Sequence, residues 1–112
     1  MKIKTSIPAK NLPRPKIHPG IILRKHVLEA RRLSQTAFAR CTGLPVSRIN
    51  EIVNGKRGIT MDAVIRFAKV LGTSEGFWIN LQAAYDRAVA LEARAAEYAR
   101  LKTLPLPASE AA

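Results

Sequence analysis

Helix stop signals recur through the middle of this 112-residue chain. Gly43, Gly55 and Gly72 each follow a short apolar segment, and glycine adopts the left-handed conformation of a helix end without strain. Ser34 and Thr60 precede two of these segments, and their hydroxyls can accept a hydrogen bond from a first helical turn. No stretch alternates apolar and polar residues long enough to predict a strand. The chain is therefore expected to be all-α.

These caps, together with apolar residues at helical spacing, predict five short helices. Proline suits the first turn of the first one, where its missing N–H costs nothing. The predicted helices run from Pro19 to about Arg31, from Gln35 to Thr42, from Pro45 or Val46 to Asn54, and from Met61 to Leu71, and the fifth begins after Thr73 or Ser74.

Composition divides the chain into three parts. Residues 1–16 hold five basic and no acidic side chains together with three prolines, so we expect a flexible basic arm. Residues 17–85 form the helical domain. Residues 86–112 are expected to be an alanine-rich helical extension with a loose tail. A heptad-like stripe at 3-4 spacing, which we expect to pack on a partner chain, comprises Leu81, Ala84, Ala88, Leu91, Ala95 and Tyr98.

The charge is strongly positive and unevenly distributed. The net charge is +11, and residues 17–72 hold ten basic against three acidic side chains. Such a surplus favours a polyanionic partner, of which nucleic acid is the simplest. A merely solubilising surface is the alternative.

Several classes of protein do not fit this sequence. The longest strongly apolar run is residues 88–91, whereas a membrane span needs about 20 residues and a secretory signal about 7–15. A single cysteine, Cys41, cannot form an internal disulfide, and we expect it to be a half-buried hydrophobe. With only His18 and His26 it gives no metal-site spacing. No catalytic constellation or phosphate loop is present. We expect a cytoplasmic protein that is no enzyme and has no metal, cofactor, membrane or small-molecule substrate.

Residues 35–54 match a helix-turn-helix, a short helix, a turn on Gly43 and a second short helix. Ala39 lies where the two helices would cross, and a larger side chain there would separate them. The N-terminal residues of a recognition helix enter the major groove. The predicted base-reading residues are therefore Val46, Ser47, Arg48 and Asn50. The predicted phosphate-binding residues, at the start of the first helix and after the second, are Gln35, Thr36, Asn54, Lys56 and Arg57.

Three large apolar residues in succession, at 77–79, cannot all face one small core. Large exposed apolar patches usually mark interfaces. Phe77, Trp78 and Leu81 are therefore predicted to form a homodimer contact, the alternative being a packed core with a partly exposed indole.

On five blocks of residues the sequence resembles the Xre/λ-repressor-like family of five-helix DNA-binding domains, and more narrowly the HigA/VapI class of antitoxins. The blocks are 17–20 (IHPG), 33–36 (LSQT), 47–60 (SRINEIVNGKRGIT), 71–74 (LGTS) and 77–82 (FWINLQ). The resemblance covers about residues 17–85. It implies a dimer that binds its own promoter and neutralises a co-encoded RelE-like, mRNA-cleaving toxin of the HigB type. Pro45 and Val46 depart from the more polar entry to the recognition helix that is usual in the family.

Three functions remain open on this basis. The first is an antitoxin that also represses its own operon at a palindromic operator. The second is a free-standing Xre-family transcriptional repressor without a toxin partner. The third is an adaptor module that uses the fold without DNA, which the distribution of charge disfavours.

Overall fold

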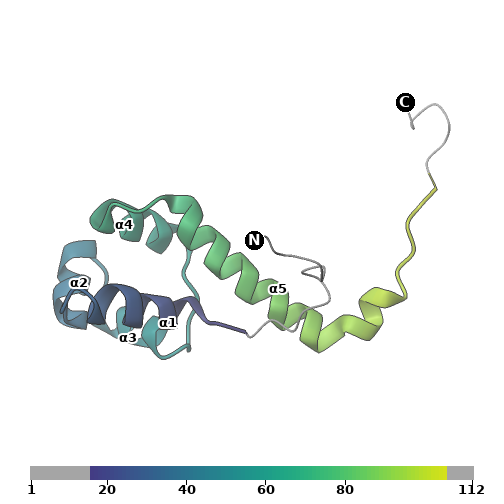
Figure 1. Ribbon diagram of the computed structural model, residues 1–112, viewed down its shortest axis with the longest axis horizontal. Coiled ribbons are helices and arrows are strands. Elements are labelled where there is room, and N and C mark those ends of the chain that lie inside the picture. Colours follow the sequence, from purple (N-terminus) through teal and green to yellow (C-terminus); the bar gives the residue numbers. More distant parts are fainter. Residues whose placement is uncertain (1–15, 106–112) are drawn as a thin grey trace, which may run out of the picture.

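The computed structural model describes residues 16–105, which are all-α, as the sequence predicts. Helix α1 (Pro19–Ile22) continues directly into a π-helical segment, η2 (Leu23–Glu29), and the two form one rod. Next come α2 (Gln35–Thr42), α3 (Val46–Val53), α4 (Met61–Leu71) and α5 (Glu75–Ala99). Figure 1 shows the first four rods gathered into a globule from which α5 projects. The arm predicted over residues 1–16 lies outside the described residues except for Lys16, as does the tail beyond residue 105.

Helices α2 and α4 occupy the predicted ranges because their end signals are local. Ser34 and Thr60 each accept a backbone N–H from the first turn through the side-chain oxygen, at 3.0 and 3.2 Å. Gly43 and Gly72 follow the last turns with φ of 74° and 72°, in the left-handed region. Both ends therefore follow from the chemistry of single residues.

The first rod ends close to the predicted residue, but without a glycine. Its regular segment ends at Glu29, the Arg31 N–H still donates to the Val27 carbonyl at 3.0 Å, and Arg32 adopts a left-handed φ of 53°. The N–H of Leu33 then donates to the carbonyl of Leu28 at 2.8 Å, which closes the helix end. The observed end thus lies within two residues of the predicted one, although arginine occupies the position that glycine usually fills.

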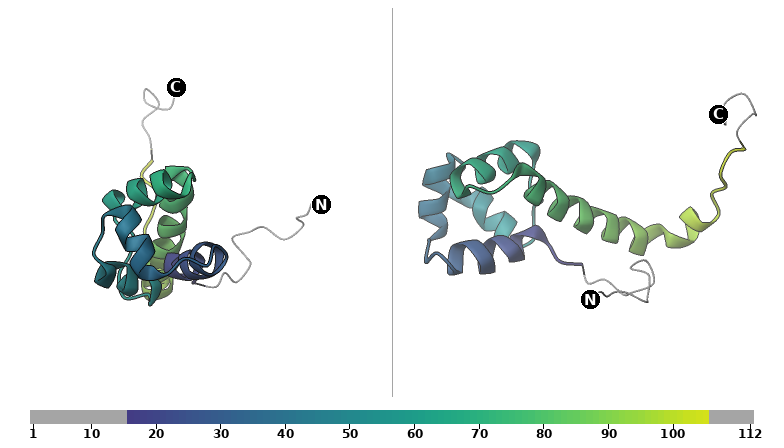
Figure 2. Two further views of the ribbon diagram at one scale, coloured as in Figure 1. Left: turned by 90° about the vertical axis from the view of Figure 1, so that its left-hand side faces the viewer. Right: turned by 45° about the horizontal axis from the view of Figure 1, so that its top comes forward.

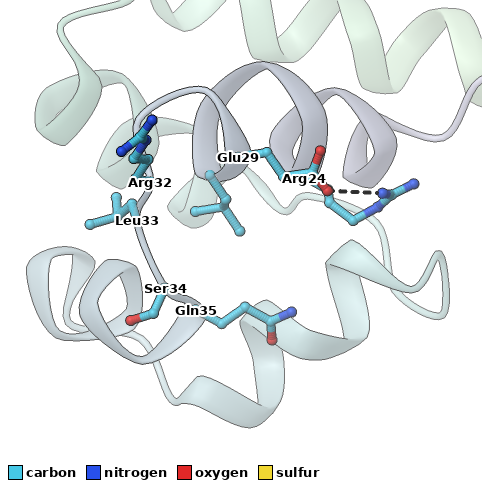
Figure 3. A pocket seen from close by; sticks show the side chains of 7 residues that line it. Arg24, Glu29, Arg32, Leu33, Ser34 and Gln35 are labelled. Atoms are coloured by element: carbon cyan, nitrogen blue, oxygen red, sulfur yellow. Dashed lines mark hydrogen bonds and ion pairs between the residues drawn. The ribbon is translucent and has the colours of Figure 1, made fainter.

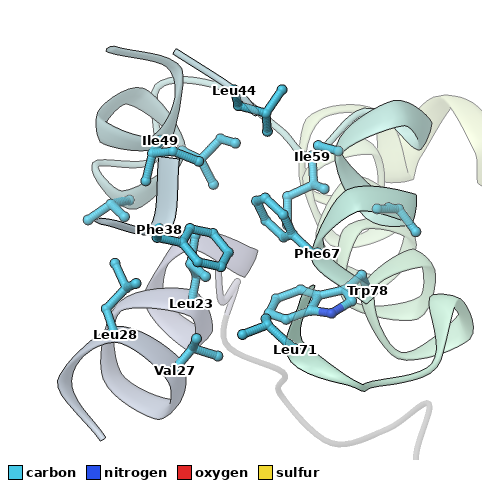
Figure 4. Close-up of a cluster of buried hydrophobic side chains, with 14 of the residues drawn as sticks. Leu23, Val27, Leu28, Phe38, Leu44, Ile49, Ile59, Phe67, Leu71 and Trp78 are labelled. Carbon is cyan, nitrogen blue, oxygen red and sulfur yellow. The ribbon is translucent and has the colours of Figure 1, made fainter. Parts of the chain in front are cut away.

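The core lies between the α1–η2–α2–α3 layer and the pair α4 and α5 (Figure 4). Three aromatic rings cross it, with Phe67 5.1 Å from Phe38 and 5.4 Å from Trp78 between ring centroids. The Trp78 indole N–H donates to the Thr73 hydroxyl at 2.8 Å, so that its one polar group is satisfied. Aliphatic side chains fill the remaining space, chiefly Leu23, Val27, Leu28, Leu44, Ile49, Ile52, Ile59, Val64 and Leu71.

Gly20 allows the start of α1 to lie directly against α3. A Cβ atom built at this position would lie 1.8 Å from the carbonyl oxygen of Ile52, which is an impossible contact. Any side chain here would therefore push α1 away from the recognition helix.

Helix α5 continues without interruption through the predicted domain boundary after residue 85. Trp78 is its one buried residue, and every residue from 91 to 105 is exposed. Arg94 has a non-helical φ of −135°, so the helix axis bends there, and the right-hand view in Figure 2 shows the bend in α5. The heptad-like stripe predicted from Leu81 to Tyr98 is consequently not straight beyond Arg94. Lys16, the first described residue, forms an ion pair with Glu92 on this helix. Within the described range, no helix is long and apolar enough to cross a membrane.

Candidate nucleic-acid interface

Helices α2 and α3 form the predicted helix-turn-helix. Gly43 makes the turn between them with a φ of 74°, and Ala39 is buried, with 5% of its surface exposed. Thr42 is also buried, and its hydroxyl donates back to the carbonyl of Phe38 at 2.9 Å, within α2. Ile49 and Ile52 are fully buried on the inner face of α3. The opposite face of α3 is thereby turned to solvent.

The predicted base-reading residues lie on this outer face of α3. Val46, Ser47 and Asn50 are exposed, whereas Arg48 is half-buried. Val46 is 46% exposed although it is apolar, at the first position of the helix. An exposed apolar side chain beside polar ones is what contact with a thymine methyl group requires.

A chain of amide hydrogen bonds joins α3 to the start of α2. The Asn50 side-chain N–H donates to the Gln35 amide oxygen at 3.1 Å, and Asn54 donates to the Asn50 amide oxygen at 3.1 Å. An asparagine amide has two N–H donors and two acceptor lone pairs, so Asn50 keeps one of each for a further partner. These contacts restrict the rotamers of Asn50 before any ligand arrives. One predicted base-reading residue is thus held between two predicted phosphate-binding residues.

The loop after α3 folds back over the helix end. Gly55 has a φ of 74°, and the Lys56 N–H donates to the carbonyl of Glu51 at 2.8 Å. The Arg57 guanidinium donates through Nε to the Glu51 carboxylate at 2.7 Å, and both side chains are a little under half exposed. The ion pair orients Arg57 and leaves its outer N–H groups for another acceptor. Sequence reasoning missed Glu51 because a separation of six residues is not a helical pairing interval.

His18 is a second residue, after Glu51, whose structural role the sequence did not predict. Its Nδ1 accepts the Gly20 N–H at 2.9 Å, which caps α1, and its ring lies edge-on to Tyr85 at 4.9 Å. Burial lowers the pKa of His18 from its ordinary value, while the Asp86 carboxylate and the Arg57 backbone oppose this shift. A histidine directly before a proline at a helix start was the available signal.

An open pocket lies between the end of η2 and the start of α2 (Figure 3). The Arg24 guanidinium there is paired with the Glu29 carboxylate at 3.1 Å, and Gln35 lines the opposite side. Thr36 is exposed in the first turn of α2. Basic and amide groups therefore flank this first turn, where helix N–H groups and the helix dipole favour an anion.

The structure separates the three residues predicted to form a dimer contact. Trp78 has no exposed surface and packs on Phe67, so its assignment to a surface contact was wrong. Phe77 lies about 100° further round the helix and is 44% exposed. Leu81 is half-buried against the core. Of the three, Phe77 alone presents a large apolar surface to a partner.

Cys41 is exposed rather than half-buried, because it lies on the outer face of α2 beside the buried Thr42. Within residues 16–105, no three histidine, cysteine, aspartate or glutamate side chains lie close enough together to hold a metal ion.

The fold and this surface define a helix-turn-helix DNA-binding domain. A model of the helix-turn-helix family matches residues 25–78. Virulence-associated protein I of Dichelobacter nodosus is 46% identical over 81 residues, which span 72% of this chain and 75% of that protein. The chain therefore belongs to the Xre-like helix-turn-helix family, which is a family of DNA-binding proteins rather than of enzymes.

Solved structures agree with this assignment. The antitoxin HigA of Pseudomonas aeruginosa, solved with the higBA promoter, has a TM-score of 0.77 and 36% identity over 81% of this chain and 100% of its own. An addiction module antidote protein of the HigA family from Coxiella burnetii has a TM-score of 0.76 and 36% identity over 82% of this chain and 100% of its own. These matches cover a larger share of the chain than the helix-turn-helix model does.

Proposed function

We propose that this protein is a cytoplasmic antitoxin that binds double-stranded operator DNA and represses its own operon. The observation that carries the proposal is the chain of amide hydrogen bonds that joins Gln35, Asn50 and Asn54 between α2 and the end of α3. The same fold occurs in a HigA antitoxin that was solved with its promoter. Pre-ordered polar side chains on a recognition helix are typical of a surface that reads base edges.

Base reading is assigned to the outer face of α3. Asn50 retains one donor and one acceptor, which match the N6 and N7 groups of adenine. Ser47 can donate or accept, and Arg48 can reach a guanine. Val46 supplies the apolar contact for a thymine methyl group.

Backbone contacts are assigned to the residues on either side of that face. Gln35 and Thr36 lie at the start of α2, where the helix N-terminus attracts a phosphate. Asn54, Lys56 and Arg57 follow α3 and are exposed. These residues fix the register of the protein on DNA without reading sequence.

DNA binding is tested by salt titration on an operator duplex and on a random-sequence duplex. Each neutralised phosphate contributes a slope of about −0.9 in log K against log salt. Arg57→Ala is expected to weaken binding to both duplexes and to make the slope shallower by about 0.9 per protomer. Asn50→Ala is expected to weaken the operator selectively, since each good base contact gives about 1–3 kcal/mol of discrimination.

Lys69→Ala provides the matched control for the loss of one positive charge. Lys69 is exposed in the last turn of α4 and belongs to neither helix of the helix-turn-helix. An equal effect of Lys69→Ala and Arg57→Ala would contradict the assigned surface. An affinity that does not change with salt would contradict DNA binding altogether.

The protein is further proposed to act as a homodimer that reads a palindrome. Phe77 supports this with its 44% exposed ring, and α5 also exposes Val89, Leu91 and Tyr98, each 37–38%. The heptad-like spacing that begins at Leu81 also includes Phe77, four residues earlier. Two recognition helices must lie about 34–36 Å apart to enter successive major grooves on one side of DNA.

Sedimentation tests the dimer directly. Phe77→Glu is expected to give a folded monomer that binds its operator poorly, because a charge would be buried in the contact. Val70→Glu on α4 is the control, since Val70 is an apolar residue of similar exposure, at 39%. A native protein that sediments as a monomer at micromolar concentration would overturn this part.

The toxin partner is proposed to be a RelE-like, mRNA-cleaving protein of the HigB type. Such a toxin is itself basic because it binds RNA. Like charges that meet in an interface cost several kcal/mol of binding free energy. The contact must therefore avoid the surface around Lys56 and Arg57. The acidic side chains of α5 suit it better, and all of them are exposed: Glu75, Asp86, Glu92 and Glu97. DNA and toxin would then use different surfaces.

Co-expression with the product of the adjacent gene tests the toxin assignment. Rescue of poisoned cells and co-purification of the two proteins are expected. Operator binding without rescue or co-purification would instead establish a free-standing Xre-family repressor.

A further inference from the structure

We infer that Gln82 on α5 is a positioning residue for DNA binding, because it fixes the loop that carries Lys56 and Arg57. The inference rests on the proposed function, and it adds a residue that lies on a different helix from every proposed DNA contact. It also makes α5, the proposed partner-binding helix, a direct support of the DNA-binding surface.

The first step is the contact between α5 and the loop. The Gln82 amide oxygen accepts the backbone N–H of Ile59 at 2.7 Å. Ile59 is 5% exposed and belongs to the core, so this hydrogen bond holds the end of the loop at its buried anchor. A Cβ atom at Gly58 would lie 3.0 Å from both polar atoms of the Gln82 amide, which shows how closely the loop backbone approaches it.

The second step is the orientation of the amide. The Gln82 side-chain nitrogen donates to the Asp86 carboxylate at 2.9 Å, one turn further along α5. This bond fixes which end of the amide faces the loop, since the carboxylate accepts only from N–H groups. Asp86 therefore directs the Gln82 oxygen toward Ile59.

The third step is a contact at the start of the loop. The His18 ring lies 3.8–3.9 Å from the place where a Cβ of Gly55 would stand. His18 and Gln82 thus border the loop near its start and at its end. The side chains of Lys56 and Arg57 project from the segment between them and are exposed. These contacts restrain the loop backbone on both sides of the segment that carries Lys56 and Arg57.

The test compares Gln82→Ala with Asn80→Ala in salt titrations on an operator duplex and a random-sequence duplex. Asn80 is an exposed amide on the same helix, so its removal matches the chemical change. Gln82→Ala is expected to weaken binding to both duplexes at low salt, by about tenfold for each phosphate contact that is lost. The slope of log K against log salt is expected to become shallower by about 0.9 for each of these contacts. Asn80→Ala is expected to leave both affinity and slope unchanged.

A charge-matched exchange separates positioning from simple support of the fold. Gln82→Glu keeps the acceptor for Ile59 but places a carboxylate against Asp86, and it is expected to weaken binding. Gln82→Glu combined with Asp86→Asn restores a donor opposite that carboxylate at unchanged net charge, and it is expected to restore the affinity and the salt slope. A coupling between the two substitutions isolates the pair from their separate effects.

The free protein supplies an independent readout. Hydrogen exchange of the Ile59 amide is expected to speed up in Gln82→Ala and to return in the double variant. All titrations are made where circular dichroism shows each variant folded. Wild-type affinity and slope in folded Gln82→Ala would overturn the inference while leaving the proposed function intact. A wild-type protein that binds neither duplex would overturn both.

Discussion

The two halves of α5 are stabilised in different ways. The first half inserts Trp78 into the core against Phe67 and supports the loop after α3 through Gln82. The second half has no buried residue. It is rich in alanine, a good helix former, with seven alanines between residues 84 and 99. Starting a helix is costly, whereas each added residue of a good helix former costs little. The packed half therefore serves as the nucleus, and the alanine-rich half continues from it without tertiary contacts of the same kind.

The largest effect is expected from removing the anchor of the packed half. Trp78→Ala should lower the free energy of unfolding by about 3–5 kcal/mol, because it leaves a cavity beside Phe67 and removes an indole from the core. Urea denaturation monitored by circular dichroism measures this. Because Trp78 is buried, Trp78→Glu would place a charge in the core, and it is expected to unfold the protein. A folded Trp78→Glu protein would contradict the packing described.

A second test concerns the close contact between α1 and α3 in the globule. Gly20→Ala is expected to lower the free energy of unfolding by about 1–3 kcal/mol, since the new methyl group would overlap the Ile52 carbonyl. Gly76→Ala is the control, because a Cβ there meets only the Ser74 hydroxyl, at 4.0 Å. Equal stability of both variants would contradict the direct contact.

A smaller effect is expected from pH, at the junction between the globule and α5. Burial holds the pKa of His18 below 6.5, so the unfolded chain takes up the proton first as the pH falls. The contribution of neutral His18 is therefore complete above about pH 6.5 and declines below it until the folded-state pKa is reached.

His18→Asn isolates this contribution, since asparagine can also cap α1 but does not titrate in this range. The loss of stability between about pH 7.5 and about pH 5.5 should be larger in the native protein than in the variant. Urea denaturation at both values measures the difference. An identical loss in the two proteins would show that His18 is not the group responsible.

The smallest effect is expected in the projecting half. Leu91→Ala should change the free energy of unfolding by less than about 0.5 kcal/mol in dilute protein, because Leu91 is exposed and alanine is a good helix former. Repeating the measurement at high concentration sharpens the comparison, since a dimer contact makes stability depend on concentration. A large loss in dilute protein would show that this half packs on its own globule.

The helix positions could largely be predicted because the signals that set them are local. Ser34, Thr60 and Gly72 each act on a backbone within a few residues, and α2 and α4 begin and end at the predicted residues. The left-handed conformation of Arg32 at the end of the first rod was the exception, since arginine carries no sign that it takes this conformation. The exposure of Ser47 and Asn50 also followed from helical spacing.

The contacts within the candidate site could not be predicted in the same way. The bond from Asn50 to Gln35 joins residues fifteen positions apart, and that from Ile59 to Gln82 spans twenty-three. Both depend on how the turn at Gly43 and the loop after α3 place their backbones. Residue types therefore indicated which groups are available, and the fold selected which of them meet.

Residues 77–79 show the difference between what the sequence determines and what tertiary packing decides. Three large apolar side chains in succession required that some face a core and some do not, because successive positions on a helix point about 100° apart. Which one is buried depends on how α5 lies against α4, and this angle places Trp78 on Phe67 and leaves Phe77 in solvent. Local sequence sets where a helix begins and ends, since its caps act over a few bonds. The rotation of that helix on its neighbours is decided only by packing among residues distant in sequence.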